Sequence, residues 1–394
     1  MPDASFDENA AVRRLMKMLS VPGRSGEESQ IAQLIISMLE SAADQNVTIA
    51  FDSANRRSPI GGQTGNLIIR LRGNRRAPRR LLMGHIDTVP LCVGAVPVRE
   101  GEYIRPKSQS TALGGDNRAG ACVVLTAALE ILRQGLPHPP LTLFFPVQEE
   151  IGLVGSRYVT AGKLGGPALC FNWDGGDPGC AIIGATGAIN LLVEVAGIAS
   201  HAGAHPEDGV SAAVIAAQAI ADLETNGWHG DISKGRRTGT SNIGSIRGGE
   251  ATNVVMPELQ LTSEVRSHDT KFRQRIVREF EKAFRAAARR QTNAKGKRGS
   301  VRIETEQRYD SFAISESEPV VQEALAAVQS IGRPSATKIS NGGLDANWMT
   351  AHGFPTVTLG CGQSGIHTVD ERLHIPSFLD ACRIALKLAT VSSE

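Results

Sequence analysis

His85 and Asp87 stand at the end of a strand-like apolar run, LLMGHID, and their side chains suit metal binding. Residues two apart in a strand point to the same side of the sheet. The imidazole of His85 could therefore bind a metal ion while the carboxylate of Asp87 accepts the other ring N–H and fixes the tautomer. A structural histidine held by its neighbour would show the same pattern, so this pair alone leaves both interpretations open.

Glu149 and Glu150 are adjacent carboxylates at the end of a second apolar run, LTLFFPVQ. Carboxylates are seldom buried unless they are paired or bound to metal. One of the two could bind a metal ion while the other acts as a general base toward metal-bound water. A polar turn that opens a loop is the alternative interpretation.

Asp116, Asp174 and His367 follow other apolar or glycine-rich segments. Asp116, in LGGDNRAG, could be only the N-cap of the helix that follows, and this segment lacks the Lys-Ser/Thr ending of a phosphate loop. Asp174, in NWDGGD, carries a turn signal. His367, in GIHTVD, follows the run PTVTLG, and a lone histidine is more often structural than a ligand.

Taken as a set, the strand ends supply two histidines and four carboxylates, namely His85, Asp116, Glu149, Glu150, Asp174 and His367. Such mixed ligands suit zinc, manganese or cobalt. A bridging carboxylate can hold two ions about 3.5–4 Å apart, and such a pair activates water. The sequence therefore predicts a two-metal site at the edge of a sheet, where open α/β folds bind ligands.

Alternating helical and strand-like patterns must position these side chains. Apolar spacing predicts helices over 10–19, 30–43 and 118–132, and strands over 66–73, 79–87 and 141–148. The second helix follows Ser25-Gly26-Glu27-Glu28, which fits a capping box. Strands that alternate with helices indicate an α/β fold with a mostly parallel sheet covered on both faces.

A different order of elements begins near Gly187. The patterns predict strands at 190–197, 241–249, 258–267 and 301–309, and helices at 211–224 and 270–291. This β-α-β-β-α-β order is that of a small two-layer domain. We therefore predict a discontinuous α/β domain, residues 1–186 and 313–394, with an inserted domain over residues 187–312.

Composition excludes several classes of protein. The formal charge of +2, from 42 basic and 40 acidic residues, offers no electrostatic case for nucleic acid or an acidic membrane surface. The six cysteines are scattered, which argues against a disulfide framework. We expect a cytoplasmic protein, because the chain shows neither a signal-peptide pattern nor an apolar stretch of about 18 residues.

Polar residues of the inserted domain are further candidates. His201, in SHAGAHP, could donate a hydrogen bond to a developing oxyanion. Arg266, in SEVRSHD, suits a substrate carboxylate because its guanidinium binds in a fork. Asn253, in ATNVV, belongs to the same domain. A polar network at a domain interface is the alternative for each.

Together these residues resemble the zinc exopeptidase and deacylase family that includes peptidase T, glutamate carboxypeptidase and acetylornithine deacetylase. The resemblance covers nearly the whole chain, in order. The motifs GHIDTVP, GGDNRAG, QEEIGLVGS, SHAGAHPEDGVSA and GIHTVDE are most similar to those of the peptidase T branch. The resemblance implies a phosphorylase/hydrolase-like catalytic domain with an inserted ferredoxin-like lid.

The resemblance also implies roles. His85 and Asp174 would hold one zinc ion, Glu150 and His367 the other, and Asp116 would bridge them, with manganese or cobalt as substitutes. Glu149 would be the general base and Asp87 would orient His85. His201 would reach the oxyanion, in many relatives from the lid of a second subunit. That role would need a homodimer through the lid, although a monomer with a mobile lid would also serve. Asn253 and Arg266 would hold the substrate's terminal carboxylate.

Two positions depart from the resemblance. Peptidase T carries an arginine just before the Gly-Gly-x-Asp run of its last third, where this chain has Asn341. One carboxylate clamp is then missing, although Asn341 remains a candidate for contact with substrate. Asn117 stands where relatives often have aspartate.

The reaction implied is hydrolysis of amide bonds in short peptides, as in a tripeptide aminopeptidase. An amidohydrolase of N-acyl amino acids, or a carboxypeptidase, would use the same metals and base, so the metal residues do not separate these activities. A non-catalytic peptide-binding relative should have lost a ligand or Glu149, and none is lost. A serine hydrolase is disfavoured because the chain has no Gly-x-Ser-x-Gly elbow.

Overall fold

The computed structural model describes residues 6–42 and 46–391. The chain divides into two compact units. The first contains the residues up to Gly184 together with 313–340 and those from Leu344 onward, and the second contains 185–312 with 341–343. Within the described residues, no helix is both long and apolar enough to cross a membrane.

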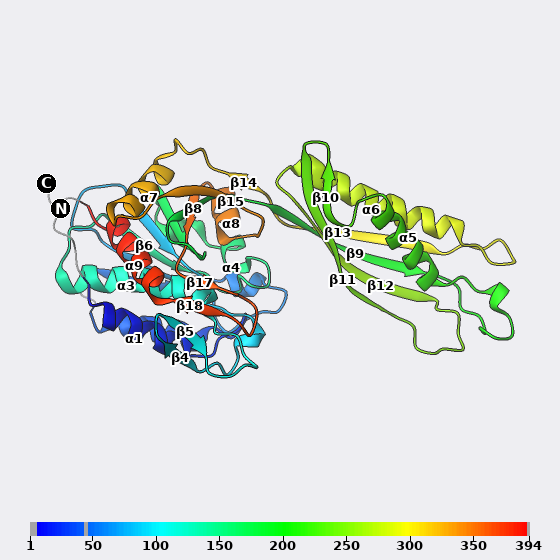
Figure 1. Cartoon of the computed structure of the whole chain (residues 1–394), viewed down its shortest axis with the longest axis horizontal. Coiled ribbons are helices and arrows are strands. Elements are labelled where there is room, and N and C mark those ends of the chain that lie inside the picture. The colour runs from blue at the N-terminus through cyan, green and yellow to red at the C-terminus, as the bar shows by residue number, and fades with distance from the viewer. Residues whose placement is uncertain (1–5, 43–45, 392–394) are drawn as a thin grey trace. The chain divides into compact units, whose positions relative to one another are not determined.

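The first unit is built on a nine-stranded sheet whose centre is parallel (Figure 1). The four central strands, in the order β6-β3-β7-β16, are β6 (Leu141–Phe145), β3 (Arg80–Met83), β7 (Leu169–Trp173) and β16 (Thr356–Leu359). Antiparallel β2 (Leu67–Leu71) and β1 (Val47–Phe51) extend one edge, and β8 (Cys180–Ala185), β14 (Phe312–Ala313) and β15 (Ala336–Ser340) extend the other. The predicted α/β class with a mostly parallel sheet is confirmed.

Helices bury this sheet. Every residue of β6 and of β16 is buried, which is the pattern of strands covered on both faces. The long helix α3 (Gly115–Gln134) contacts α9 (Ile375–Ala389), α1 (Glu8–Leu19) and α2 (Ser29–Glu40). The 3-10 turn at Pro206–Asp208 belongs to the second unit. In the first unit, the shorter helices are α4 (Val154–Arg157), α7 (Pro319–Ser330) and α8 (Asp345–Ala351), with single 3-10 turns at Ala54–Arg57, Pro90–Cys92 and Ala161–Leu164. This rigid layer fixes where the strands end, and therefore where the candidate ligands lie.

A four-stranded antiparallel sheet that the sequence patterns did not predict lies in the same unit. Its order is β17 (Gln363–Ser364), β18 (Arg372–His374), β5 (Tyr103–Pro106) and β4 (Pro97–Glu100). These strands are two to four residues long, too short to show a period of two. The segment that carries His367 connects β17 to β18.

The predicted capping box was wrong. Helix α2 begins at Ser29, after an N-cap residue, Glu28, whose side chain makes no capping hydrogen bond. The Ser25 hydroxyl instead donates to the Asp87 carboxylate at 2.7 Å. The Glu28 carboxylate accepts the Gln148 N–H at 3.1 Å. Both side chains are engaged by segments far away in sequence, which a local motif cannot indicate.

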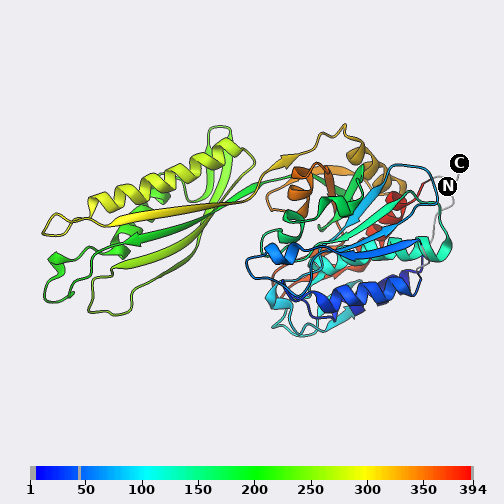
Figure 2. The same cartoon turned by 180° about the vertical axis from the view of Figure 1, so that it is seen from behind.

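The second unit is a five-stranded antiparallel sheet with α5 (Ala212–Thr225) and α6 (Thr270–Arg290) side by side on one face (Figures 1 and 2). The strand order is β10 (Gly230–Lys234), β11 (Arg237–Gly248), β12 (Glu258–Ser267), β9 (Gly187–Ala196) and β13 (Ser300–Tyr309). Helix α6 buries Phe272, Ile276, Phe280 and Phe284, which recur every four residues along one stripe. Strand β10 was not predicted, because GDISK is polar and mostly exposed at the sheet edge.

Candidate metal centre

His85 and Asp87 lie just beyond the end of β3, and both are buried. The Nδ1 atom of His85 is 3.3 Å from Oδ1 of Asp87. Its Nε2 atom faces two other carboxylates, with Oδ1 of Asp116 at 3.3 Å and Oδ1 of Asp174 at 3.8 Å. The ring therefore has one nitrogen toward an orienting carboxylate and the other toward two candidate ligands.

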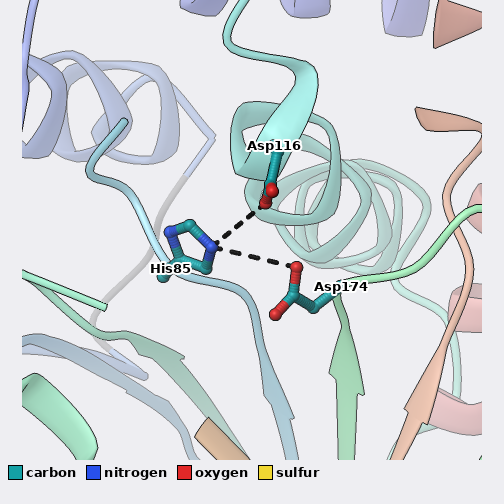
Figure 3. A group of neighbouring side chains, drawn as sticks. All are labelled: His85, Asp116 and Asp174. Carbon is teal, nitrogen blue, oxygen red and sulfur yellow. Dashed lines mark ion pairs between the residues drawn. The ribbon is translucent and has the colours of Figure 1, made fainter. Parts of the chain in front are cut away.

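Asp116 lies at the start of α3, and Asp174 follows β7 (Figure 3). The backbone before Asp116 turns at Gly114, whose φ of +79° is a left-handed conformation that favours glycine. The figure shows both carboxylates pointing toward the His85 ring from different elements. Three chain segments thus converge on one point beside a parallel strand end.

A second group shares Asp116. The Nε2 atom of His367 is 3.2 Å from Oδ2 of Asp116 and 3.0 Å from Oε2 of Glu150. His367 has a φ of +62°, and its side chain is 47% exposed, whereas that of His85 is 2% exposed. The two oxygens of Asp116 therefore face different histidines, one buried and one open to solvent.

The donor set fits two cations. In each group, one ligand atom per residue lies within 4.8 Å of the others: His85, Asp116 and Asp174 form one group, and Asp116, Glu150 and His367 form the second. Within the described part of the chain, Oδ1 of Asp116 is buried without a hydrogen-bond partner, and such an atom is costly unless something compensates it. A cation between His85 and Asp116 would supply the missing interaction.

The electrostatics of the ion-free site agree with this interpretation. Burial lowers the pKa of His85, but Glu149, Asp116, Asp87 and Asp174 outweigh it and raise that pKa well above its ordinary value. Hydrogen bonds to Asp116 and Glu150 raise the pKa of His367 to about 10. Burial and the negative charge of Asp116 raise the pKa of Asp174 well above its usual range. The cluster thus has more negative charge than its own histidines compensate, a condition that favours cations.

Glu149 is the remaining carboxylate of the site. Its side chain is 11% exposed, and its Oε2 atom lies 4.0 Å from Nε2 of His85. Burial raises the pKa of Glu149 well above its usual range, and Asp174, Asp345 and Glu150 add to the effect. A buried carboxyl group at this place, beside both groups of candidate ligands, is suited to take and return a proton.

Asp87 organises more than His85. Its Oδ1 atom accepts the backbone N–H of Glu149 at 2.9 Å, and its Oδ2 atom accepts that of Glu150 at 3.2 Å and the Ser25 hydroxyl at 2.7 Å. Burial opposes its ionisation, yet the interactions with His85, Ser25 and the Glu149 N–H lower the pKa of Asp87. One buried carboxylate therefore fixes both the first histidine and the turn that carries the two glutamates.

Three further acidic side chains at the site were not predicted. Glu371 accepts three backbone N–H groups of the segment that carries Asp116. Glu28 is fully buried, and burial with the charge of Asp87 raises its pKa to about 7. Asp345 is 1% exposed, and burial raises its pKa to about 6. The quoted motif GIHTVDE contained Glu371, but nothing local marked it as a hydrogen-bond acceptor.

The predicted substrate residues of the second unit fall into two places. His201 and Asn253 belong to adjacent backbone segments. The Ala202 N–H donates to the Asn253 carbonyl at 2.9 Å, and the backbones of His201 and Val254 form an isolated antiparallel β-bridge. This place lies beyond the Glu258 end of β12. Arg266 lies near the other end of that ten-residue strand, which is about 30 Å long at roughly 3.4 Å per residue. Within one copy of the chain, these two places cannot touch the same carboxylate.

Arg266 and Asn341 already have polar neighbours. The Arg266 guanidinium donates to both oxygens of Glu264, at 2.7 and 2.9 Å. The Oδ1 atom of Asn341 is 3.0 Å from Nε2 of His268. Glu264 and Arg266 are two apart in β12, so their side chains point to one face of the sheet, whereas His268 lies just beyond the end of that strand. A ligand carboxylate at Arg266 would compete with Glu264.

Comparisons with known proteins extend over nearly the whole chain. The model of peptidase family M20/M25/M40 matches residues 81–390. A tripeptidase from Staphylococcus aureus has a TM-score of 0.86 at 27% identity, covering 98% of each chain. Aminopeptidase PepT from Bacillus cereus has a TM-score of 0.83, also at 27% identity and 98% coverage of each. The uncharacterized protein YqjE of Bacillus subtilis is 27% identical over 97% of this chain and 98% of its own length.

Proposed function

Because this chain belongs to peptidase family M20/M25/M40, as its motifs suggested, we propose that it is a tripeptide aminopeptidase that uses two zinc ions. The main support for two metal positions is that the two oxygens of Asp116 face two different histidines, each beside a further carboxylate. The similarity to a tripeptidase and to an aminopeptidase at 27% identity over 98% of the chain supports the substrate class.

His85, Asp174 and Asp116 would hold one ion, and Asp116, Glu150 and His367 the other. Bound zinc would polarise the scissile carbonyl and lower the pKa of a water molecule. Two histidines with three carboxylates form a nitrogen and oxygen donor set that zinc accepts, and manganese or cobalt could substitute.

Glu149 then moves the proton. It takes a proton from the attacking water and returns it to the leaving amine, so one carboxylate serves as base and then acid. Asp87 keeps the backbone of Glu149 in place through the 2.9 Å hydrogen bond.

His201 is suited to donate a hydrogen bond to the oxyanion. Its Nδ1 atom accepts the backbone N–H groups of Gly203 and Ala204 at 3.2 and 3.0 Å. The ring proton therefore resides on Nε2, and that N–H is the group available to a ligand.

We further propose that His201 and Asn253 serve the active site of a second copy of the chain. The support is their separation from Arg266 by the length of β12, which is longer than a tripeptide. The test mixes a Glu149→Ala chain with a His201→Ala chain, each inactive alone. Mixed dimers should regain a fraction of wild-type activity, whereas a site built from a single chain would regain none.

The activity itself is tested with a substrate panel and zinc, manganese and cobalt in turn. The panel holds a tripeptide, its N-acetylated form, a dipeptide and several N-acyl amino acids. Cleavage restricted to peptides with a free amine supports the aminopeptidase. Cleavage of the acylated compounds instead would replace it with the amidohydrolase and leave the metal assignment in place.

A further inference from the structure

Glu371 holds the segment that carries the bridging aspartate. Glu371 is buried, with only 1% of its surface exposed. Oε2 accepts the N–H groups of Leu113 at 2.7 Å and Gly114 at 2.8 Å, and Oε1 accepts that of Asp116 at 3.0 Å. Hydrogen bonds to a charged acceptor are stronger than those between neutral groups. One buried carboxylate therefore satisfies three backbone donors across 255 residues of sequence.

The glycines of this segment fit the carboxylate closely. A Cβ atom at Gly115 would lie 3.2 Å from Oε1 of Glu371, tighter than an ordinary contact. Gly114 has a φ of +79°. The backbone thus approaches Glu371 at a distance that side chains would oppose, and it does so immediately before Asp116.

Glu371 also belongs to the loop of the second histidine. Its own N–H donates to the Thr368 carbonyl at 3.2 Å, in the turn that follows His367. His367 has a φ of +62°, and a non-glycine residue keeps such a conformation only where its surroundings hold it. The carboxylate of Glu371 is the point at which this turn is tied to the Asp116 segment.

We propose that Glu371 is a positioning residue that clamps the Asp116 segment to the His367 loop and so sets the affinity of the ion these two side chains share with Glu150. Both of its oxygens face N–H groups, so it acts on the ligands and not as one of them. The inference rests on the proposed metal centre, and it adds a residue that neither the motifs nor the comparisons assign.

The matched control is Glu130, another buried glutamate, 6% exposed, in the last turns of α3. Its carboxylate accepts from the Gln134 side chain at 2.9 Å, away from any candidate ligand. Glu371→Gln and Glu130→Gln therefore make the same chemical change in one unit. In Glu371→Gln, the amide NH₂ must face at least one backbone N–H, so a hydrogen bond is lost.

The experiment titrates the metal-free chains with zinc against a chromophoric chelator and records the visible spectrum with cobalt. We expect Glu371→Gln to bind one of two ions about 10–100-fold more weakly, in the range for residues that orient ligands. Its cobalt spectrum should change, and excess metal should restore most of kcat with little change in KM. Glu130→Gln should match the wild type in all of these.

Unchanged affinity for both ions in a folded Glu371→Gln chain would overturn the inference. If that variant does not fold, Gly115→Ala tests the same contact, because it presses a methyl group on Oε1 while keeping the carboxylate. It should weaken the same ion, and wild-type affinity there would equally overturn the clamp. A wild-type chain that binds no ion would refute the proposed function itself. If wild type and Glu371→Gln both bind two ions with the same high affinity, only this inference is refuted.

Discussion

Replacing Asp87 by asparagine tests how the first histidine and the glutamate turn are held. Asp87 has four polar neighbours: the Ser25 hydroxyl at 2.7 Å, the N–H groups of Glu149 and Glu150 at 2.9 and 3.2 Å, and Nδ1 of His85 at 3.3 Å. An asparagine keeps one acceptor oxygen and places two donors where the other oxygen stood.

The least costly placement keeps the oxygen toward Glu149 and His85. The NH₂ group then faces Ser25, whose hydroxyl can rotate and accept, and the Glu150 N–H, which cannot. One charge-assisted hydrogen bond is lost, worth about 1.5–3 kcal/mol, and the negative charge beside His85 disappears. We expect a tenfold to hundredfold loss of metal affinity at the His85 site, which corresponds to about 1.4–2.7 kcal/mol.

The assay is competition for zinc against a chelator at pH 7.5, followed by kcat at saturating metal. Ser25→Ala is the matched control, because it removes one hydrogen bond of Asp87 but keeps the charge and both backbone contacts. It should cost much less metal affinity than Asp87→Asn. Equal losses in the two variants, or wild-type affinity in Asp87→Asn, would refute the orienting role of the carboxylate.

Three other predictions concern proton transfers and buried charge. Glu149→Ala should keep its metal content and lose several orders of magnitude in kcat, and near-normal turnover would rule out Glu149 as the base. His367, with a pKa of about 10 in the ion-free chain, must lose its proton to bind metal. Zinc binding at pH 8 should therefore release about one proton more than in His367→Ala, as calorimetry in buffers of different ionisation enthalpy would show, and equal release would contradict this. The pKa of Glu28 is raised to about 7 from an ordinary 4.5, so its ionisation weakens the fold as pH rises through that window. The Tm of Glu28→Gln relative to wild type should increase from pH 4.5 to pH 7.5, and a constant difference would argue against a buried titrating carboxyl.

Sequence patterns alone predicted the residue types that the structure brings together at the candidate metal centre, because polar side chains at strand ends follow from local features. An apolar run that stops at His85, or at Glu149 and Glu150, marks both a buried strand and the edge where its last side chains emerge. Parallel strands covered by helices bring those edges together, so candidates far apart in sequence were expected at one place. The same periodicity indicated the long helices, but it missed β10 and the four-stranded sheet, whose strands are short or polar.

Only the tertiary structure decided how these groups are held. That each oxygen of Asp116 faces a different histidine depends on where α3 begins relative to the His367 loop. Ser25 and Glu28 matched a local capping motif but hydrogen-bond to distant segments, at Asp87 and Gln148. Hydrogen bonds of this kind join residues about 60 to 255 positions apart, and they depend on angles and distances that no local pattern encodes. Residue types therefore predicted a candidate metal site, while the packing of the chain determined which carboxylates lie where they could bind an ion and which hold the backbone around them.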